Sequence, residues 1–208
     1  FGASVAIDGN YAIVGAYRED TSGPDSGAAY IYERTVDGSW NQVPTILKAS
    51  DPSGNYAFGN SVAISGNYAI VGAYGEATGG ANSGAAYIFE RTVDGSWNEI
   101  KMLKASNAGG GDQFGKSVSI GGNYAIVGAY REDTTAADSG AAYIFERTVD
   151  GSWNQVPTIL KASNAGTGTT EKFGWSVAID GNYAIVGAYQ EDTNGDDSGA
   201  AYIFERTV

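Results

Sequence analysis

The sequence has no cysteine and no histidine. Disulfides, zinc and iron–sulfur sites of the usual ligand types, and catalysis through a Ser-His or Cys-His pair, are therefore excluded. No apolar run approaches the roughly 20 residues that a membrane-spanning helix needs. Direct insertion into a membrane is therefore not expected.

Basic residues are scarce: 12 Lys and Arg stand against 24 Asp and Glu, which gives a net charge of −12. This balance disfavours nucleic acid, whose phosphates require a basic stripe, and it disfavours adsorption to an anionic membrane. Cations and basic surfaces are electrostatically permitted partners. Alternatively, the acidity serves solubility alone.

What the chain does have is repetition. The segment Gly-Asn-Tyr-Ala-Ile-Val-Gly-Ala-Tyr occurs unchanged at residues 9–17, 66–74, 122–130 and 181–189. A Phe-Gly pair opens each copy at nearly equal spacing, at Phe1, Phe58, Phe114 and Phe173. A fixed period of this size indicates one supersecondary unit that packs against its neighbours. We therefore expect a single repeat domain over 1–208, with units 1–57, 58–113, 114–172 and 173–208.

One unit reads as four β-strands. Asp-Gly turns favour tight hairpins, and the apolar, aromatic and β-branched runs between them favour strands, here 4–7, 11–17, 28–34 and 40–48. Pro44 lacks a backbone donor, so the fourth strand is expected at the outer edge of its sheet. The fourth copy stops after its third strand. The prediction is an all-β fold, a β-propeller of four-stranded antiparallel blades that forms part of a larger ring or of a ring completed by several chains. A solenoid of stacked hairpins is the alternative.

The repeat resembles the FG-GAP repeat, the blade of the integrin alpha-chain propeller and of many bacterial and algal surface proteins. The matching segments are Phe1-Gly2-Ala3-Ser4-Val5-Ala6, Ile13-Val14-Gly15-Ala16 and Gly27-Ala28-Ala29-Tyr30-Ile31-Tyr32, and Gly38-Ser39-Trp40 resembles the Trp-containing turn of the bacterial-type variant. Tyr17 replaces the family's proline, and the family's calcium loop between the first two strands is absent. The resemblance implies an extracellular or cell-surface location and a role in adhesion.

The loop after the second strand is the one acidic cluster of the repeat. Its carboxylates could hold Ca²⁺, which prefers oxygen ligands, or could simply form turns and keep the loop solvated. The candidate ligands are Glu19, Asp20, Asp25, Glu132, Asp133, Asp138, Glu191, Asp192, Asp196 and Asp197. The second copy keeps Glu76 alone, so it should bind a metal worst. No other cofactor is expected.

Aromatic residues beside this loop are the candidates for ligand binding. A tyrosine ends the second strand of each copy, at Tyr17, Tyr74, Tyr130 and Tyr189, where it could stack on a sugar, contact a partner protein or pack between blades. Trp40, Trp97 and Trp153 are expected between blades. Trp175 has no counterpart, since its equivalents are Ala3, Asn60 and Lys116. Trp175 therefore joins the candidates.

Near-identical copies argue against an enzyme, because a catalytic centre is normally a single asymmetric arrangement. The sequence predicts a non-enzymatic extracellular or cell-surface module that binds a protein or glycan through propeller loops. The alternative is a structural building block of a filament, sheath or large complex; a third reading is an accessory domain of a larger enzyme. An uncovered edge strand also predicts self-association.

Overall fold

The computed structural model describes residues 1–164 and 170–206, which form fifteen β-strands in four sheets. No helix occurs among these residues, and so none that could cross a membrane. We number the sheets as blades 1 to 4. Blade 1 holds β1 (Ser4–Asp8), β2 (Tyr11–Ala16), β3 (Ala28–Arg34) and β4 (Trp40–Leu47); blade 2 holds β5 (Ser61–Ser65), β6 (Tyr68–Ala73), β7 (Ala85–Arg91) and β8 (Trp97–Leu103); blade 3 holds β9 (Ser117–Gly121), β10 (Tyr124–Ala129), β11 (Ala141–Arg147) and β12 (Trp153–Leu160); blade 4 holds β13 (Phe173–Asp180), β14 (Tyr183–Ala188) and β15 (Ala200–Glu205).

Each blade is an antiparallel meander whose strands follow one another in chain order. The first hairpin turns over two residues, because Asp8 pairs with Tyr11, and Gly9 takes the positive φ of 55° that such a turn requires. The strand that contains Pro44 pairs with β3 alone and lies at the outer edge, as predicted. A register shift in β3–β4 between Tyr30 and Tyr32 marks a bulge.

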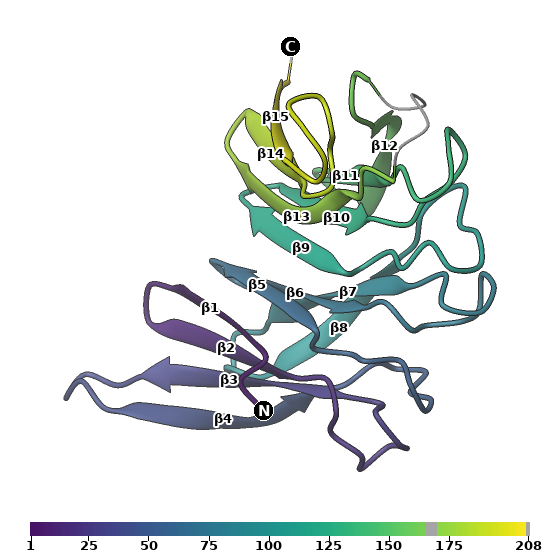
Figure 1. Ribbon diagram of the computed structural model, residues 1–208. Helices are drawn as coiled ribbons and strands as arrows, with labels where there is room; N and C mark the ends of the chain where they lie inside the picture. Colours follow the sequence, from purple (N-terminus) through teal and green to yellow (C-terminus); the bar gives the residue numbers. More distant parts are fainter. Residues whose placement is uncertain (165–169, 207–208) are drawn as a thin grey trace.

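The blades fan out around their first strands (Figure 1). The strands β1, β5, β9 and β13 lie side by side in that order. The fourth strands of blades 1 to 3 lie at the outer edges of their sheets. The sheets of the described residues form an open arc and do not close into a ring. This is the blade architecture of a β-propeller, so the predicted fold class is confirmed.

Adjacent blades approach so closely at the centre that a side chain has no room. A Cβ atom on Gly15 would lie 2.0 Å from the carbonyl oxygen of Gly59 in the next blade, and the pairs Gly72–Gly115 and Gly128–Gly174 repeat this approach. Ser4 Oγ also donates a hydrogen bond to the Gly59 carbonyl, at 2.8 Å. The glycine inside the repeated motif is therefore required by blade packing.

Aromatic residues fill the outer part of the interfaces between blades 1 and 2 and between blades 2 and 3. Trp97 of blade 2 packs edge-on against Tyr11 of blade 1, with ring centroids 6.1 Å apart, and Trp153 packs likewise on Tyr68. Arg91 Nη1 donates to the Tyr11 hydroxyl at 2.7 Å, with the guanidinium 4.5 Å from the ring centroid. The structure thus places two of the three repeated tryptophans between blades.

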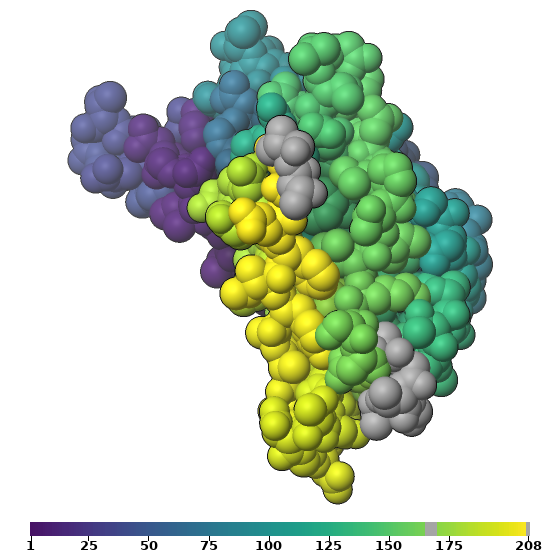
Figure 2. All heavy atoms as spheres, turned by 90° about the horizontal axis from the view of Figure 1, so that it is seen from above, coloured from purple at the N-terminus to yellow at the C-terminus, as the bar shows by residue number. Residues whose placement is uncertain are grey.

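The two outer faces of the arc are apolar and exposed. On one outer face, blade 1 exposes Val5 and Ile7, and Ile7 is 67% exposed. The equivalent face of blade 2 is buried, because it packs against blade 1. Blade 4 presents Ile185 and Ile203, the latter 73% exposed. Figure 2 looks onto blade 4, which lies at the front of the molecule in yellow-green and yellow.

Candidate functional site

In every blade, the loop between the second and third strands and the connection to the next blade lie at the same ends of the strands. Together these segments form one face of the arc, which we call the loop face. The residue after each Phe-Gly pair lies there, just before or at the start of the first strand of its blade. These four positions, which we call the variable row, are Ala3, Asn60, Lys116 and Trp175. The repeat differs between its copies at a position where the blades meet.

Three members of the variable row are neighbours in space: Asn60 contacts Lys116, and Lys116 contacts Trp175. Asn60 Nδ2 donates to the backbone carbonyl of Lys116 at 3.0 Å, and Lys116 Nζ donates to Asn60 Oδ1 at 3.4 Å. The Lys116 ammonium also lies 5.3 Å from the ring centroid of Trp175 and 4.8 Å from that of Tyr74. Lys116 is therefore held between two aromatic rings by its neighbour in the row.

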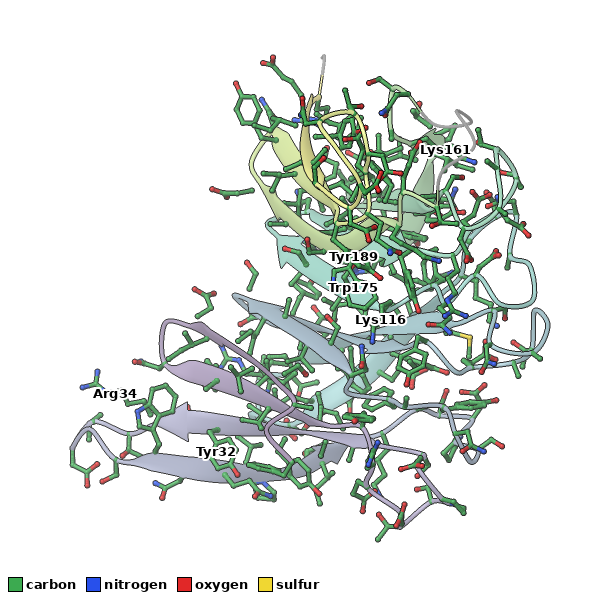
Figure 3. The ribbon with its side chains drawn as sticks, viewed as in Figure 1. Tyr32, Arg34, Lys116, Lys161, Trp175 and Tyr189 are labelled. Atoms are coloured by element: carbon green, nitrogen blue, oxygen red, sulfur yellow. The ribbon has the colours of Figure 1, made fainter. Side chains whose placement is uncertain are left out.

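Trp175 is the centre of an aromatic cluster. Its ring centroid lies 4.9 Å from that of Tyr130, nearly perpendicular at 89°, and 4.7 Å from that of Tyr189. Tyr130 is buried beneath the cluster, whereas Trp175 is 39% and Tyr189 45% exposed. Figure 3 shows Lys116, Trp175 and Tyr189 following one another across the blades. The result is an exposed aromatic surface with a rigid base.

Three cationic side chains, those of Lys116, Arg131 and Lys172, and the carboxylate of Asp138 lie around this surface. Arg131 lies 5.4 Å and Lys172 lies 5.5 Å from the centroid of the Tyr130 ring. Lys172 also forms an ion pair with Asp138 at 2.6 Å. Burial lowers the pKa of Lys116, and none of the ion pairs between described residues includes this lysine.

The structure thus brings together four of the five residues expected to bind a ligand: Tyr74, Tyr130, Trp175 and Tyr189. Tyr17 lies apart from them at the blade 1 end, half-buried, with the Arg18 guanidinium 5.3 Å from its ring centroid. Lys116 was not among the predicted site residues. The sequence does show that Lys116 stands at the position of the repeat equivalent to Trp175, and this could have marked it as a candidate.

The glutamates in the acidic loops of blades 1 to 3 have lysine partners. Glu132 is fully buried and pairs with Lys161 at 2.7 Å, and Glu76, equally buried, pairs with Lys104. Glu19 pairs with Lys48 at 3.3 Å. Each lysine directly follows the fourth strand of the same blade, which returns the chain to the loop face. Burial raises the pKa of Glu76, but hydrogen bonds from Lys104 and Thr78 outweigh it and lower the pKa below its ordinary value.

Asparagines from the preceding blade also bond the loop glutamates. Asn107 Nδ2 donates to Glu132 Oε1 at 2.8 Å and Asn107 Oδ1 accepts from the Tyr143 hydroxyl at 2.8 Å. Asn164 bonds Glu191 in the same way. The glutamates therefore bind the loops to the blades.

The loop aspartates act in turns or face solvent. Asp20 Oδ1 accepts from the Asp25 amide at 2.8 Å, and Asp192 Oδ1 from the Asp197 amide at 2.7 Å. Asp133 and Asp196 are exposed. Within residues 1–164 and 170–206, no three acidic side chains are grouped so that they could hold a metal ion. Calcium binding stays a prediction.

A cavity of about 440 Å³ lies between blades 3 and 4, lined among others by Tyr124, Ile144, Leu160 and Arg206. At the two preceding interfaces the corresponding space beside Tyr11 and Tyr68 holds the tryptophan of a fourth strand. The cavity is thus shaped for blade packing, and the ligand site is better sought on the loop face.

Four-stranded meanders in an arc, with a variable row on the loop face, define a propeller-type repeat protein. The sequence profile of the FG-GAP repeat matches residues 1–32, 40–89, 97–145 and 153–204, so the chain belongs to the FG-GAP repeat family. No curated protein matches the sequence. Among solved structures, an ancestral GH74 enzyme is similar at 16% identity and a TM-score of 0.42, over 89% of this chain and 24% of that one.

Proposed function

We propose that this chain is a non-enzymatic binding module of an extracellular or cell-surface protein, which recognises a glycan or protein through its loop face. The observation that carries the proposal is the exposed surface of Trp175 and Tyr189 over the buried Tyr130. FG-GAP repeats are typical of extracellular or surface proteins, and this supports the proposed location. The resemblance to adhesion proteins supports the role.

The chemistry of this surface favours a glycan. Aromatic rings offer flat apolar faces for the C–H faces of sugars, and fixed rings lose little conformational entropy on binding. Trp175 and Tyr189 are each held by contacts to a neighbouring ring. The proposal includes the absence of catalysis. Glu76 and Glu132, the buried carboxylates of the loops, already pair with lysines and so have a structural role.

The test is glycan binding by the Trp175→Ala variant. We expect wild-type protein to bind members of an oligosaccharide array, and the variant to lose about tenfold or more in affinity, as for truncation of a central aromatic residue. Trp40→Ala is the matched control, because Trp40 is 41% exposed but lies at the end of blade 1 opposite the loop face. It should bind like the wild type.

One result would contradict the proposal, and a second would decide between its two ligand classes. If Trp175→Ala binds every oligosaccharide as well as the wild type, the aromatic surface is not the site. If the array stays empty while Trp175→Ala weakens binding to a protein ligand, the partner is a protein. Thermal unfolding of both variants separates loss of the site from loss of the fold.

The alternative function is a structural building block, and the apolar outer faces favour it. The face of blade 1 with Val5 and Ile7 repeats that of blade 2 with Val62 and Ile64, which packs on Ile13 and Ile31 of blade 1. Blade 4 presents the equivalents of the last two, Ile185 and Ile203. Two copies could therefore stack head to tail, as the blades of one chain do.

A further inference from the structure

We propose that Lys116 makes the aromatic surface selective for an acidic glycan, in which a sugar ring stacks on Trp175 and its carboxylate binds the Lys116 ammonium. The inference rests on the proposed function and names the ligand class of the same site. Its starting point is asymmetry: the variable row is occupied by Ala3 and Asn60 in the first two blades, and by Lys116 and Trp175 in the last two.

Lys116 differs from the other lysines of the loop face. Those at the ends of the fourth strands have glutamate partners, and Lys172 has Asp138. In a chain with twice as many acidic as basic residues, the described ion pairs leave out Lys116. Burial, with no compensating carboxylate, lowers its pKa. An incoming anion would offset the cost of burying this charge.

The ammonium is also positioned for a ligand. Asn60 bonds both the backbone carbonyl and the Nζ atom of Lys116, and the Tyr74 ring lies against the same ammonium. An ammonium has three donors, and among the described residues Asn60 is the only hydrogen-bond partner of Lys116 Nζ. The exposed Trp175 ring lies 5.3 Å away, a separation that a single sugar residue with its carboxylate can span.

A single carboxylate fits this site better than a phosphate or sulfate group. Phosphate sites usually combine several cations or an arginine fork, because the anion carries more charge and more acceptors. Here Lys172 is already paired with Asp138. A uronic acid supplies one charge beside a sugar ring.

The experiment compares acidic oligosaccharides with their own neutral forms. Short oligomers of galacturonate, glucuronate and mannuronate are titrated into the protein by calorimetry in 0.15 M salt, each beside its carboxyl-reduced counterpart. One charge-assisted hydrogen bond predicts that the best acidic oligomer binds roughly tenfold or more tightly than its reduced form. Lys116→Met, which keeps the apolar stem, should reduce this preference to about twofold or less.

Two control variants separate the possible outcomes. Lys101→Met removes an exposed lysine of β8 and should keep the preference, whereas Trp175→Ala should weaken acidic and reduced oligomers alike. Equal binding of acidic and reduced forms, or a preference that survives in folded Lys116→Met, would overturn the inference and leave the binding surface intact. If neither form of any oligomer binds, the glycan-binding function fails as well. Binding of an acidic peptide in place of all sugars would also overturn it.

Discussion

At the residue scale, identical positions of the four copies have different tasks, and their neighbours in space decide which. Tyr130 and Tyr189 end equivalent strands, yet Tyr130 is buried and Tyr189 is 45% exposed. The difference arises because Trp175 of blade 4 covers Tyr130, and the described chain places nothing equivalent over Tyr189. An exposed aromatic surface therefore arises in an almost uniform repeat from one or two substituted positions.

The buried loop glutamates lead to a prediction about stability. Lys104→Met leaves Glu76 fully buried without its cation, which should lower the free energy of unfolding at pH 7 by about 3 kcal/mol. The folded-state pKa of Glu76 lies below its unfolded value, so the ion pair stabilises above the unfolded pKa and is lost as pH falls through the folded pKa. Urea unfolding at pH 7 and in acid should therefore show the cost of the substitution shrinking in acid.

Glu76→Gln in the Lys104→Met background is the informative control. A neutral side chain needs no cation, so the double variant should regain part of the lost stability. Lys101→Met, at an exposed position, should stay within about 0.5 kcal/mol of the wild type. A cost equal at all pH values would show that packing of the lysine stem, and not its charge, is what matters.

The sequence alone could not predict most of these contacts between side chains. The acidic loops were visible, but Lys104 lies 28 residues beyond Glu76, and only the return of β8 to the loop face brings them together. The same holds for Lys116 and Trp175, which belong to different blades. The sequence marked Trp175 as unmatched by the other copies and showed Lys116 at the same position, without showing that the two are neighbours.

At the element scale, the strands follow closely from local chemistry. Apolar runs and Asp-Gly turns predicted four strands in each of the first three copies and three in the fourth, and Pro44 predicted the outer edge; both are confirmed. Local pattern sufficed because the turns fix the register of each hairpin. The need for glycine at Gly72 was less apparent, since it comes from the backbone of Gly115 in the next blade.

Gly72→Ala tests this close approach. The added Cβ would lie 2.0 Å from the Gly115 carbonyl oxygen, so blades 2 and 3 must separate, at a cost of about 3 kcal/mol. Gly110→Ala is the control, because there the nearest atom would be 3.5 Å away and the change should be within about 0.5 kcal/mol. Thermal and urea unfolding measure both. A Gly72→Ala protein as stable as the wild type would show that the blades can shift freely.

At the scale of the whole molecule, the arc is built by repeating one interface. Ile64 of blade 2 packs in the same cluster as Ile13 and Ile31 of blade 1, and Ile120 of blade 3 takes the same place beside Ile70 and Ile88. Because the interface joins unlike faces, the same contact between two chains would be head to tail and would extend the arc. The aromatic surface of Trp175, which we propose as the binding site, lies on the loop face, away from these contacts.

Head-to-tail association predicts a specific pattern of complementation. Ile7→Asp places a charge on the outer face of blade 1, and Ile203→Asp does so on blade 4; each protein alone should remain monomeric where the wild type associates with rising concentration. Mixed together, each variant still offers the face that the other lacks, so a heterodimer of twice 21.5 kDa should form. Sedimentation velocity distinguishes the species. A wild-type protein that stays monomeric at high concentration would refute the building-block function, and single variants that still form dimers would show that the contact joins like faces.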